Sequence, residues 1–232
     1  MKLVILSDIH GNDIYFNRCM ALIKKLIPDK IIVLGDCFGY MHEGNTILNK
    51  LRKLNAKLLL GNHEAMLLGK LQYDLEKEEI YGLITDRKTI SKSNFKYMEQ
   101  LEPKLYEEID NRRILYVHGC PDNPVNGYLY ADDKTYNWGR KQYDYIFMGH
   151  THYPYIKKFS NTTYVNVGSV GLPRCNGQKP SFVVFDTQTG EVVIHEVLIN
   201  RKELEKVLLK DIHPTVCECL KRKGNNICHQ LM

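Results

Sequence analysis

Five short apolar runs, each followed by side chains that can bind a metal, constrain this chain more than any other feature. The runs occupy residues 3–6, 31–34, 58–60, 114–117 and 145–148. The polar residues that follow them are, in order, Asp8 and His10, Asp36, Asn62 and His63, His118, and His150 and His152. Short apolar runs beside glycine are typical of strands that are covered on both faces.

The segments between the first three runs predict helical crossovers. Residues 19–26 place apolar side chains at helical spacing, Asn12 is a typical N-cap, and Pro28 follows the last turn. A weaker helical pattern covers residues 44–54. This order predicts a βαβαβ unit with parallel strands, in which ligands bind beyond the carboxyl ends of the strands. Since side chains two apart on an extended segment face the same way, His150 and His152 can face one pocket.

Composition limits the class of protein. The chain has 232 residues, 44% hydrophobic and 25% charged, which is compatible with one α/β domain. Its net charge of +5 includes a surplus of three in residues 201–232, where seven Lys and Arg stand against four Asp and Glu. The remaining surplus is too small to predict duplex nucleic-acid binding.

Seven cysteines without paired spacing, and no secretory or membrane-spanning run, lead us to expect a cytoplasmic protein with reduced thiols and no membrane association. Cys217, Cys219, Cys228 and His229 raise the alternative of a zinc site. Their spacing fits no common zinc module, and an exposed tail is the preferred interpretation.

Taken in order, the polar blocks resemble the calcineurin-like metallophosphoesterase superfamily. They are Asp8-x-His10, Gly35-Asp36, Gly61-Asn62-His63-Glu64, His118 and Gly149-His150-x-His152. Residues 168–174 are similar to the small single-domain phosphodiesterase branch. The resemblance implies an α/β fold (α+β layered). This is a four-layer α-β-β-α sandwich of two mixed sheets, with a dinuclear metal site at the carboxyl ends of the strands.

The second half of the chain suits that fold. Residues 163–167, 181–185 and 191–195 are expected strands, residues 187–190 form the hairpin turn, and residues 201–210 form a closing helix. We expect a single domain over residues 1–210 and a flexible C-terminal tail over residues 211–232.

The resemblance also implies the ligand set. Asp8, His10, Asp36 and His152 would hold one divalent metal, and Asp36 would bridge to a second metal that Asn62, His118 and His150 also hold. A mixed nitrogen and oxygen set suits Mn, Fe, Co, Ni or Zn.

Three further residues have expected roles beside the ligands. His63 would act as general acid, with support of the metal ligands as the alternative. Glu64 would support the site or begin a helix, and Arg174 would either clamp the phosphate or lie at the surface.

The resulting prediction is a phosphodiesterase that acts on a small phosphoester or nucleotide-type substrate, by attack of a hydroxide that bridges the two metals. Phosphomonoesterases of the protein-phosphatase type and dinucleoside polyphosphate hydrolases are the alternative. They carry Gly-Asp-x-x-Asp-Arg-Gly, where this chain has Gly35-Asp36-Cys37-Phe38-Gly39-Tyr40-Met41. A non-catalytic scaffold would not need the complete ligand set. The aromatic-rich segment 120–143, which includes Tyr128, Tyr136 and Trp138, would form a pocket rim or pack on the protein.

Overall fold

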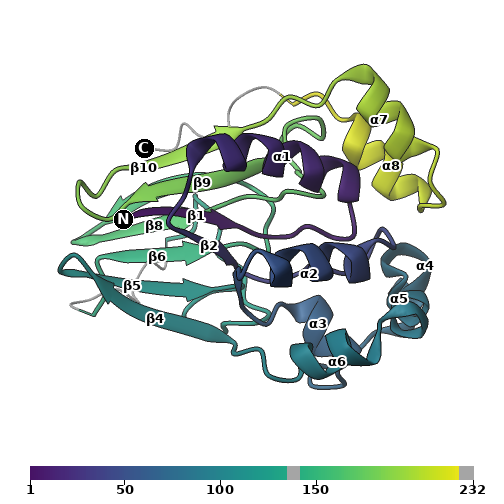
Figure 1. Ribbon diagram of the computed structural model, residues 1–232, viewed down its shortest axis with the longest axis horizontal. Helices are drawn as coiled ribbons and strands as arrows, with labels where there is room; N and C mark the ends of the chain where they lie inside the picture. Colours follow the sequence, from purple (N-terminus) through teal and green to yellow (C-terminus); the bar gives the residue numbers. More distant parts are fainter. Residues whose placement is uncertain (135–141, 225–232) are drawn as a thin grey trace.

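Two five-stranded mixed sheets form the centre of the computed structural model, which describes residues 1–134 and 142–224 (Figure 1). The first sheet has the order β10 (Val192–Glu196), β9 (Ser181–Asp186), β1 (Lys2–Leu6), β2 (Lys30–Val33) and β3 (Lys57–Leu58). The second has the order β4 (Lys104–Ile109), β5 (Arg112–Val117), β6 (Tyr145–Met148), β8 (Thr162–Asn166) and β7 (Tyr155–Phe159). The expected pair of mixed sheets is confirmed.

The first sheet contains the predicted βαβαβ unit. Strands β1, β2 and β3 are parallel, and the crossovers are α1 (Asp13–Leu26) and α2 (Gly44–Lys53). The side chain of Asn12 accepts a hydrogen bond from the Tyr15 amide at 3.2 Å, as expected of an N-cap. The predicted hairpin joins β9 and β10, which pair antiparallel. Strands β4 and β7, at the two edges of the second sheet, were not predicted.

The main core lies between the two sheets, where their inward-facing side chains pack together. Leu3, Ile5 and Ile32 from the first sheet pack with Tyr116 and Phe147 from the second, and all five are fully buried. Alternate residues of β1 and β2 point the other way, toward α1 and α2. This two-sided burial explains why the strands read as continuous apolar runs. Strands β1, β2 and β3 lie in one sheet, whereas β5 and β6 lie in the other, so the strands that precede the candidate ligands come from both sheets.

The outer face of the second sheet is covered differently from that of the first. Leu115, Ile146 and Tyr164 pack there against Cys120 and Leu129 of the following loop. The resemblance implied a second layer of helices on this face. In residues 1–134 and 142–224, the residues that pack against it come from a loop instead.

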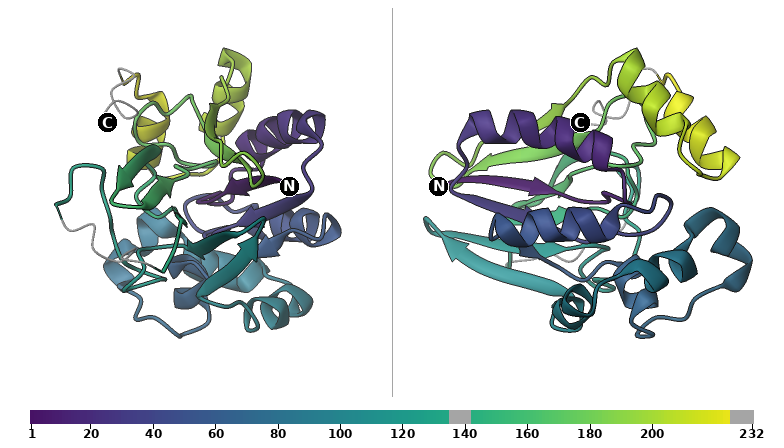
Figure 2. Two further views of the ribbon diagram at one scale, coloured as in Figure 1. Left: turned by 90° about the vertical axis from the view of Figure 1, so that its left-hand side faces the viewer. Right: turned by 45° about the vertical axis from the view of Figure 1, so that its right-hand side comes forward.

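Helices gather at the carboxyl ends of the strands in two groups (Figures 1 and 2). One group comprises α3 (Asn62–Leu67), the 3₁₀ turn η1 (Leu75–Lys77), α4 (Glu78–Tyr81), α5 (Leu83–Thr89) and α6 (Lys92–Met98). The other comprises α7 (Arg201–Leu208), which matches the expected closing helix, and α8 (Pro214–Lys221). In the described part of the chain, no helix is long and apolar enough to span a membrane.

The C-terminal segment differs from the expected tail. Residues 214–221 form α8, whose Val216 and Leu220 are buried against Leu172 and Val207. Apolar residues spaced four apart on this helix supply its packing face. The expectation of a flexible tail from residue 211 is therefore wrong for these residues, and residues 225–232 lie outside the described part.

Most of the described cysteines are thiols, as expected. They are Cys19, Cys37, Cys120, Cys217 and Cys219. Cys175 is disulfide-bonded, so the expectation of reduced thiols is wrong there. Of the four residues weighed as zinc ligands, Cys228 and His229 lie outside the described residues.

Candidate metal centre

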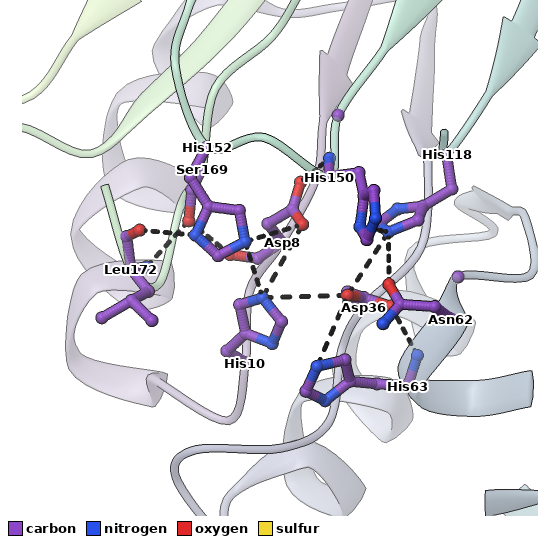
Figure 3. A network of polar contacts seen from close by, with 12 residues as sticks. Asp8, His10, Asp36, Asn62, His63, His118, His150, His152, Ser169 and Leu172 are labelled. Carbon is purple, nitrogen blue, oxygen red and sulfur yellow. Dashed lines mark hydrogen bonds and ion pairs between the residues drawn. The ribbon is translucent and has the colours of Figure 1, made fainter. Parts of the chain in front are cut away.

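All seven residues that the sequence nominated as metal ligands converge at the carboxyl ends of the strands (Figure 3). Each is at most 5% exposed. Asp8, His10 and Asp36 follow strands of the first sheet, whereas His118, His150 and His152 follow strands of the second. Asn62 is the first residue of α3. The centre therefore exists because the two sheets pack with these ends together.

Asp8, His10 and His152 form the first cluster. The Nε2 atom of His152 lies 3.1 Å from Asp8 Oδ1 and 3.1 Å from His10 Nε2. His10 Nε2 lies 3.7 Å from the same Asp8 oxygen. One atom from each side chain points to a common position, with all three atoms within 4.8 Å of one another. Such a grouping of one oxygen and two nitrogens is suited to a divalent transition metal.

Asp36, Asn62, His118 and His150 form the second cluster. His118 Nε2 lies at its centre, 2.9 Å from Asn62 Oδ1, 3.1 Å from His150 Nδ1 and 3.3 Å from Asp36 Oδ2. The same Asp36 oxygen lies 3.8 Å from His10 Nε2 in the first cluster. Asp36 therefore faces both clusters, as a bridging carboxylate must.

The hydrogen bonds around the first cluster test whether its donors fit a cation. His10 Nδ1 donates to the Phe38 carbonyl at 3.0 Å, and His152 Nδ1 donates to the Leu172 carbonyl at 2.7 Å. When each ring carries a single proton, that proton is on Nδ1, and the two Nε2 lone pairs face each other across 3.1 Å. Two facing lone pairs repel unless a cation lies between them, and carbonyl partners of this kind fix the tautomer of metal-bound histidines. The donor set fits a metal.

The charges of the buried side chains in the centre also fit a bound cation. Burial raises the pKa values of the Asp8 and Asp36 carboxyls, but the facing imidazoles outweigh it and hold both well below their usual range. Burial lowers the pKa of His118, but Asp36 and Asp8 outweigh it and raise that pKa to about 9. Two buried carboxylates thus attract positive charge, in keeping with the rule that buried charges are paired or coordinate metals.

The backbone is strained at five of the candidate ligands. Asp8, His10, Asp36, His150 and His152 all have positive φ, between 49° and 63°. Residues other than glycine rarely adopt this left-handed conformation, and such strain collects at functional sites where the surrounding structure holds it in place. Neighbouring side chains supply some of that support, since the Asp8 carboxylate accepts a hydrogen bond from the His150 amide at 3.0 Å.

Glu64 supports the loop that carries Asp36. Its carboxylate accepts hydrogen bonds from the amides of Asp36, Cys37 and Gly61 at 2.8, 2.7 and 3.2 Å. Gly61 leaves room for this packing, because an added Cβ would lie 2.1 Å from Asp36 Oδ1. Burial, followed by Asp36, raises the pKa of Glu64 to about 7. The carboxylate that the sequence expected to support the site thus holds the backbone that carries Asp36.

His63 lies beside the two clusters. Its Nε2 atom is 3.9 Å from Asp36 Oδ2, and its amide donates to the other Asp36 oxygen at 3.0 Å. Its ring packs against Tyr40 and Tyr81, with centroids 5.2 and 4.8 Å away. Burial lowers the pKa of His63 to about 3, although Asp36 raises it. The ring is thus held beside the Asp36 carboxylate, which is the neighbour that favours its protonated form.

Arg174 is half-buried near the first cluster. Its amide donates to the His152 carbonyl at 3.3 Å. Burial lowers the pKa of the guanidinium, but Tyr40 and other groups outweigh it and raise that pKa. Arg174 is therefore next to the centre rather than at a distant surface.

Aromatic and acidic residues outside the sequence motifs complete the surroundings. Tyr128 lies with its ring 4.0 Å from that of His150, which places part of the 120–143 segment at the rim. Tyr136 and Trp138 of that segment lie outside the described residues. Sequence reasoning missed Tyr40, Tyr81 and the buried Asp86, because no motif marks the helical segment 75–98 that supplies two of them.

Comparison with known proteins agrees with this geometry. A family model for the calcineurin-like phosphoesterase superfamily domain matches residues 1–190. An uncharacterized protein of Methanocaldococcus jannaschii is 29% identical over 231 residues, covering 91% of this chain and 93% of its own.

Solved structures share the fold. A metallophosphoesterase from Sphaerobacter thermophilus matches with a TM-score of 0.79 at 22% identity, covering 95% of this chain and 98% of its own. A hypothetical protein from Pyrococcus horikoshii matches with a TM-score of 0.80 at 21% identity, covering 97% of this chain and 99% of its own.

Proposed function

Because the chain belongs to the calcineurin-like phosphoesterase superfamily, we propose that this metallophosphoesterase is a phosphodiesterase that uses two divalent metals. The observation that carries the proposal is the position of Asp36, whose Oδ2 faces both clusters at 3.8 Å from His10 Nε2 and 3.3 Å from His118 Nε2. A carboxylate between two histidine-containing clusters is the arrangement that a two-metal hydrolase requires.

Each metal would have its own set of ligands. Asp8, His10 and His152 would hold the first with Asp36, and Asn62, His118 and His150 would hold the second with the same carboxylate. Manganese, iron, cobalt, nickel and zinc all suit these donors. When bound, the metals would lower the pKa of a water molecule and neutralise charge on the phosphoryl oxygens.

The protein residues then have separate tasks. The backbone carbonyls of Phe38 and Leu172 keep the Nε2 atoms of His10 and His152 free to bind, and Glu64 holds the loop that presents Asp36. His63, packed between aromatic rings and within 3.9 Å of Asp36, would donate a proton or hydrogen bond to the leaving oxygen.

The charge around the centre favours a diester over a monoester. A monoester dianion carries one more negative charge than a diester, and enzymes for dianions commonly add cationic clamps. This chain has Gly39-Tyr40-Met41 where protein phosphatases carry Asp-Arg-Gly. Tyr40 packs its ring on His10 and His63. Arg174 is the cationic side chain that we place beside the first cluster.

The test compares matched substrates. Bis(4-nitrophenyl) phosphate and 4-nitrophenyl phosphate release the same phenol, and both are assayed with Mn²⁺, Ni²⁺, Co²⁺ or Zn²⁺. We expect a higher kcat/KM for the diester. A monoester preferred by more than about tenfold, equivalent to about 1.4 kcal/mol of transition-state stabilisation, would refute the diesterase proposal.

A further inference from the structure

A groove of about 800 Å³ lies beside the candidate metal centre, and Asn62 is the candidate ligand that lines it. It begins at Asn62 and continues along the surface formed by residues 71–81 and 126–128. Its volume lies within the range of small-molecule binding sites. A substrate held at the centre would therefore extend one of its groups into this groove.

Three tyrosines make the wall of the groove aromatic, and two of them contact residues of the centre. The ring of Tyr128 lies 4.0 Å from that of His150, and the ring of Tyr81 lies 4.8 Å from that of His63. Tyr73 lies farther out, with its ring 6.5 Å from that of Tyr81 and at a small angle of 26° to it. The tyrosine wall thus begins beside His63, which would donate to the leaving oxygen. It continues to an aromatic surface that suits a planar group.

The charged and polar groups of the groove narrow the kind of ligand. Among the described residues that line it, Lys77 is the cation and Asp74 the anion, and the two lie 4.0 Å apart. This described part of the lining therefore has no surplus positive charge to match further phosphate groups. Gln72 and Asn126 also line it and offer amide donors and acceptors of the kind that pair with the edges of bases.

We propose that this groove binds the nucleoside leaving group of the phosphodiester, with its base stacked on the tyrosine wall. The proposal rests on the proposed function, and it names the substrate class as a nucleoside diester. It disfavours a dinucleoside polyphosphate, because the groove does not match the extra charge. Stacking on aromatic side chains tolerates every base, so we expect the preference for one base to be weak.

Direct binding of a nucleoside tests the groove without relying on turnover. Adenosine and uridine are titrated separately into the full-length Mn²⁺-loaded protein and followed by ligand-observed NMR. We expect both to bind. Tyr73→Leu should weaken binding by about tenfold, which is within the range expected for the loss of one base–aromatic stack. Tyr73→Phe, which keeps the ring, should bind like the wild type. Tyr106→Leu is a control on β4, where the Tyr106 side chain is exposed outside the groove.

The outcomes separate this proposal from the proposed function. No nucleoside binding, or binding that Tyr73→Leu leaves unchanged, would overturn the groove assignment even if simple diesters are hydrolysed. Nucleoside binding that requires the Tyr73 ring, without hydrolysis of any diester, would support the groove and count against the diesterase. Adenosine and adenosine 5′-diphosphate are also compared on the metal-free protein. If the diphosphate binds more than about tenfold more tightly than adenosine, the assignment of an uncharged ligand to the groove is wrong.

Discussion

Asp36 combines burial, strain and a position between the two clusters. Its φ is 57°, it is 1% exposed, and its carboxylate faces histidines of both clusters. Of the buried carboxylates at the centre, Asp8 is grouped with the first cluster alone. The two aspartates therefore allow a matched comparison, because Asp36 is shared between the clusters and Asp8 belongs to one.

Replacing these two aspartates should therefore have different effects on metal content. Asp36→Asn removes the charge that both metals share, and we expect it to lose most of the metal at both positions. Asp8→Asn should retain about one equivalent, against about two in the wild type. Elemental analysis of proteins purified with Mn²⁺ gives the readout. Two full equivalents in Asp36→Asn would contradict the bridging role.

His63 permits a test of acid catalysis. His63→Asn should leave both metals bound, because its ring is not among the proposed ligands. Asparagine can donate a hydrogen bond but not a proton, so we expect a rate loss of about 10² or more for poor leaving groups and a smaller loss for acidic phenols. The measurement is kcat/KM across aryl diesters of graded leaving-group pKa. An equal loss across the series would instead assign His63 to support of the ligands.

At the level of elements, the loop after β2 depends on a helix that the sequence motifs do not include. Asp86 of α5 is 1% exposed, and its carboxylate accepts hydrogen bonds from the Gly39 amide at 2.8 Å and from His42 Nδ1 at 3.2 Å. Gly39 has a φ of 85° and packs so closely on His63 that an added Cβ would lie 2.0 Å from Nδ1. The neighbouring Phe38 carbonyl orients His10. Helix α5 therefore holds the loop that positions His10 and His63.

Removing the Asp86 carboxylate should weaken this loop measurably. Asp86→Ala leaves the Gly39 amide without its partner, and we expect the free energy of unfolding to fall by about 1–3 kcal/mol. Asp86→Asn should cost less, because its amide oxygen can still accept from Gly39. Urea unfolding with EDTA present separates this effect from metal binding, which would itself add stability. Equal stability of Asp86→Ala and the wild type would show that the hydrogen bond contributes nothing.

At the scale of the whole molecule, the C-terminal helices close one side of the centre. Leu220 of α8 and Val207 of α7 are fully buried in a cluster with Tyr15, Tyr40 and Leu172. Tyr40 contacts His63, and Leu172 orients His152 through its carbonyl. The end of the described chain thus packs against two residues that contact the centre.

This packing predicts a large stability loss for a residue that the sequence placed in a tail. Leu220→Ala should lower the free energy of unfolding by about 2–5 kcal/mol, as expected for truncation of a buried leucine. Leu209→Ala is the matched control, because Leu209 follows α7 and is 86% exposed. Denaturant unfolding of both variants without metal provides the comparison. If Leu220→Ala were no more destabilising than Leu209→Ala, the packing of α8 would not contribute to stability.

The buried strands and the polar side chains at their carboxyl ends could be predicted from the sequence alone. Apolar runs such as those before Asp36 and His150 are local patterns, and strands buried on both faces leave few other interpretations. The order of the polar blocks was sufficient to indicate the family. Helix α1 was also predictable, because its cap and its spacing are local.

The residues that surround the candidate ligands, in contrast, could be identified only from the packing of the folded chain. Asp86, Tyr81 and Leu220 lie in short helices whose sequences carry no distinctive pattern. Their roles arise from contacts with residues at least 18 positions away in the sequence, such as Gly39, His63 and Leu172. The two-sheet arrangement likewise brings His118 and His150 from one sheet to Asp36 from the other. Periodicity reports which face of an element is buried, whereas packing between elements decides what that face meets.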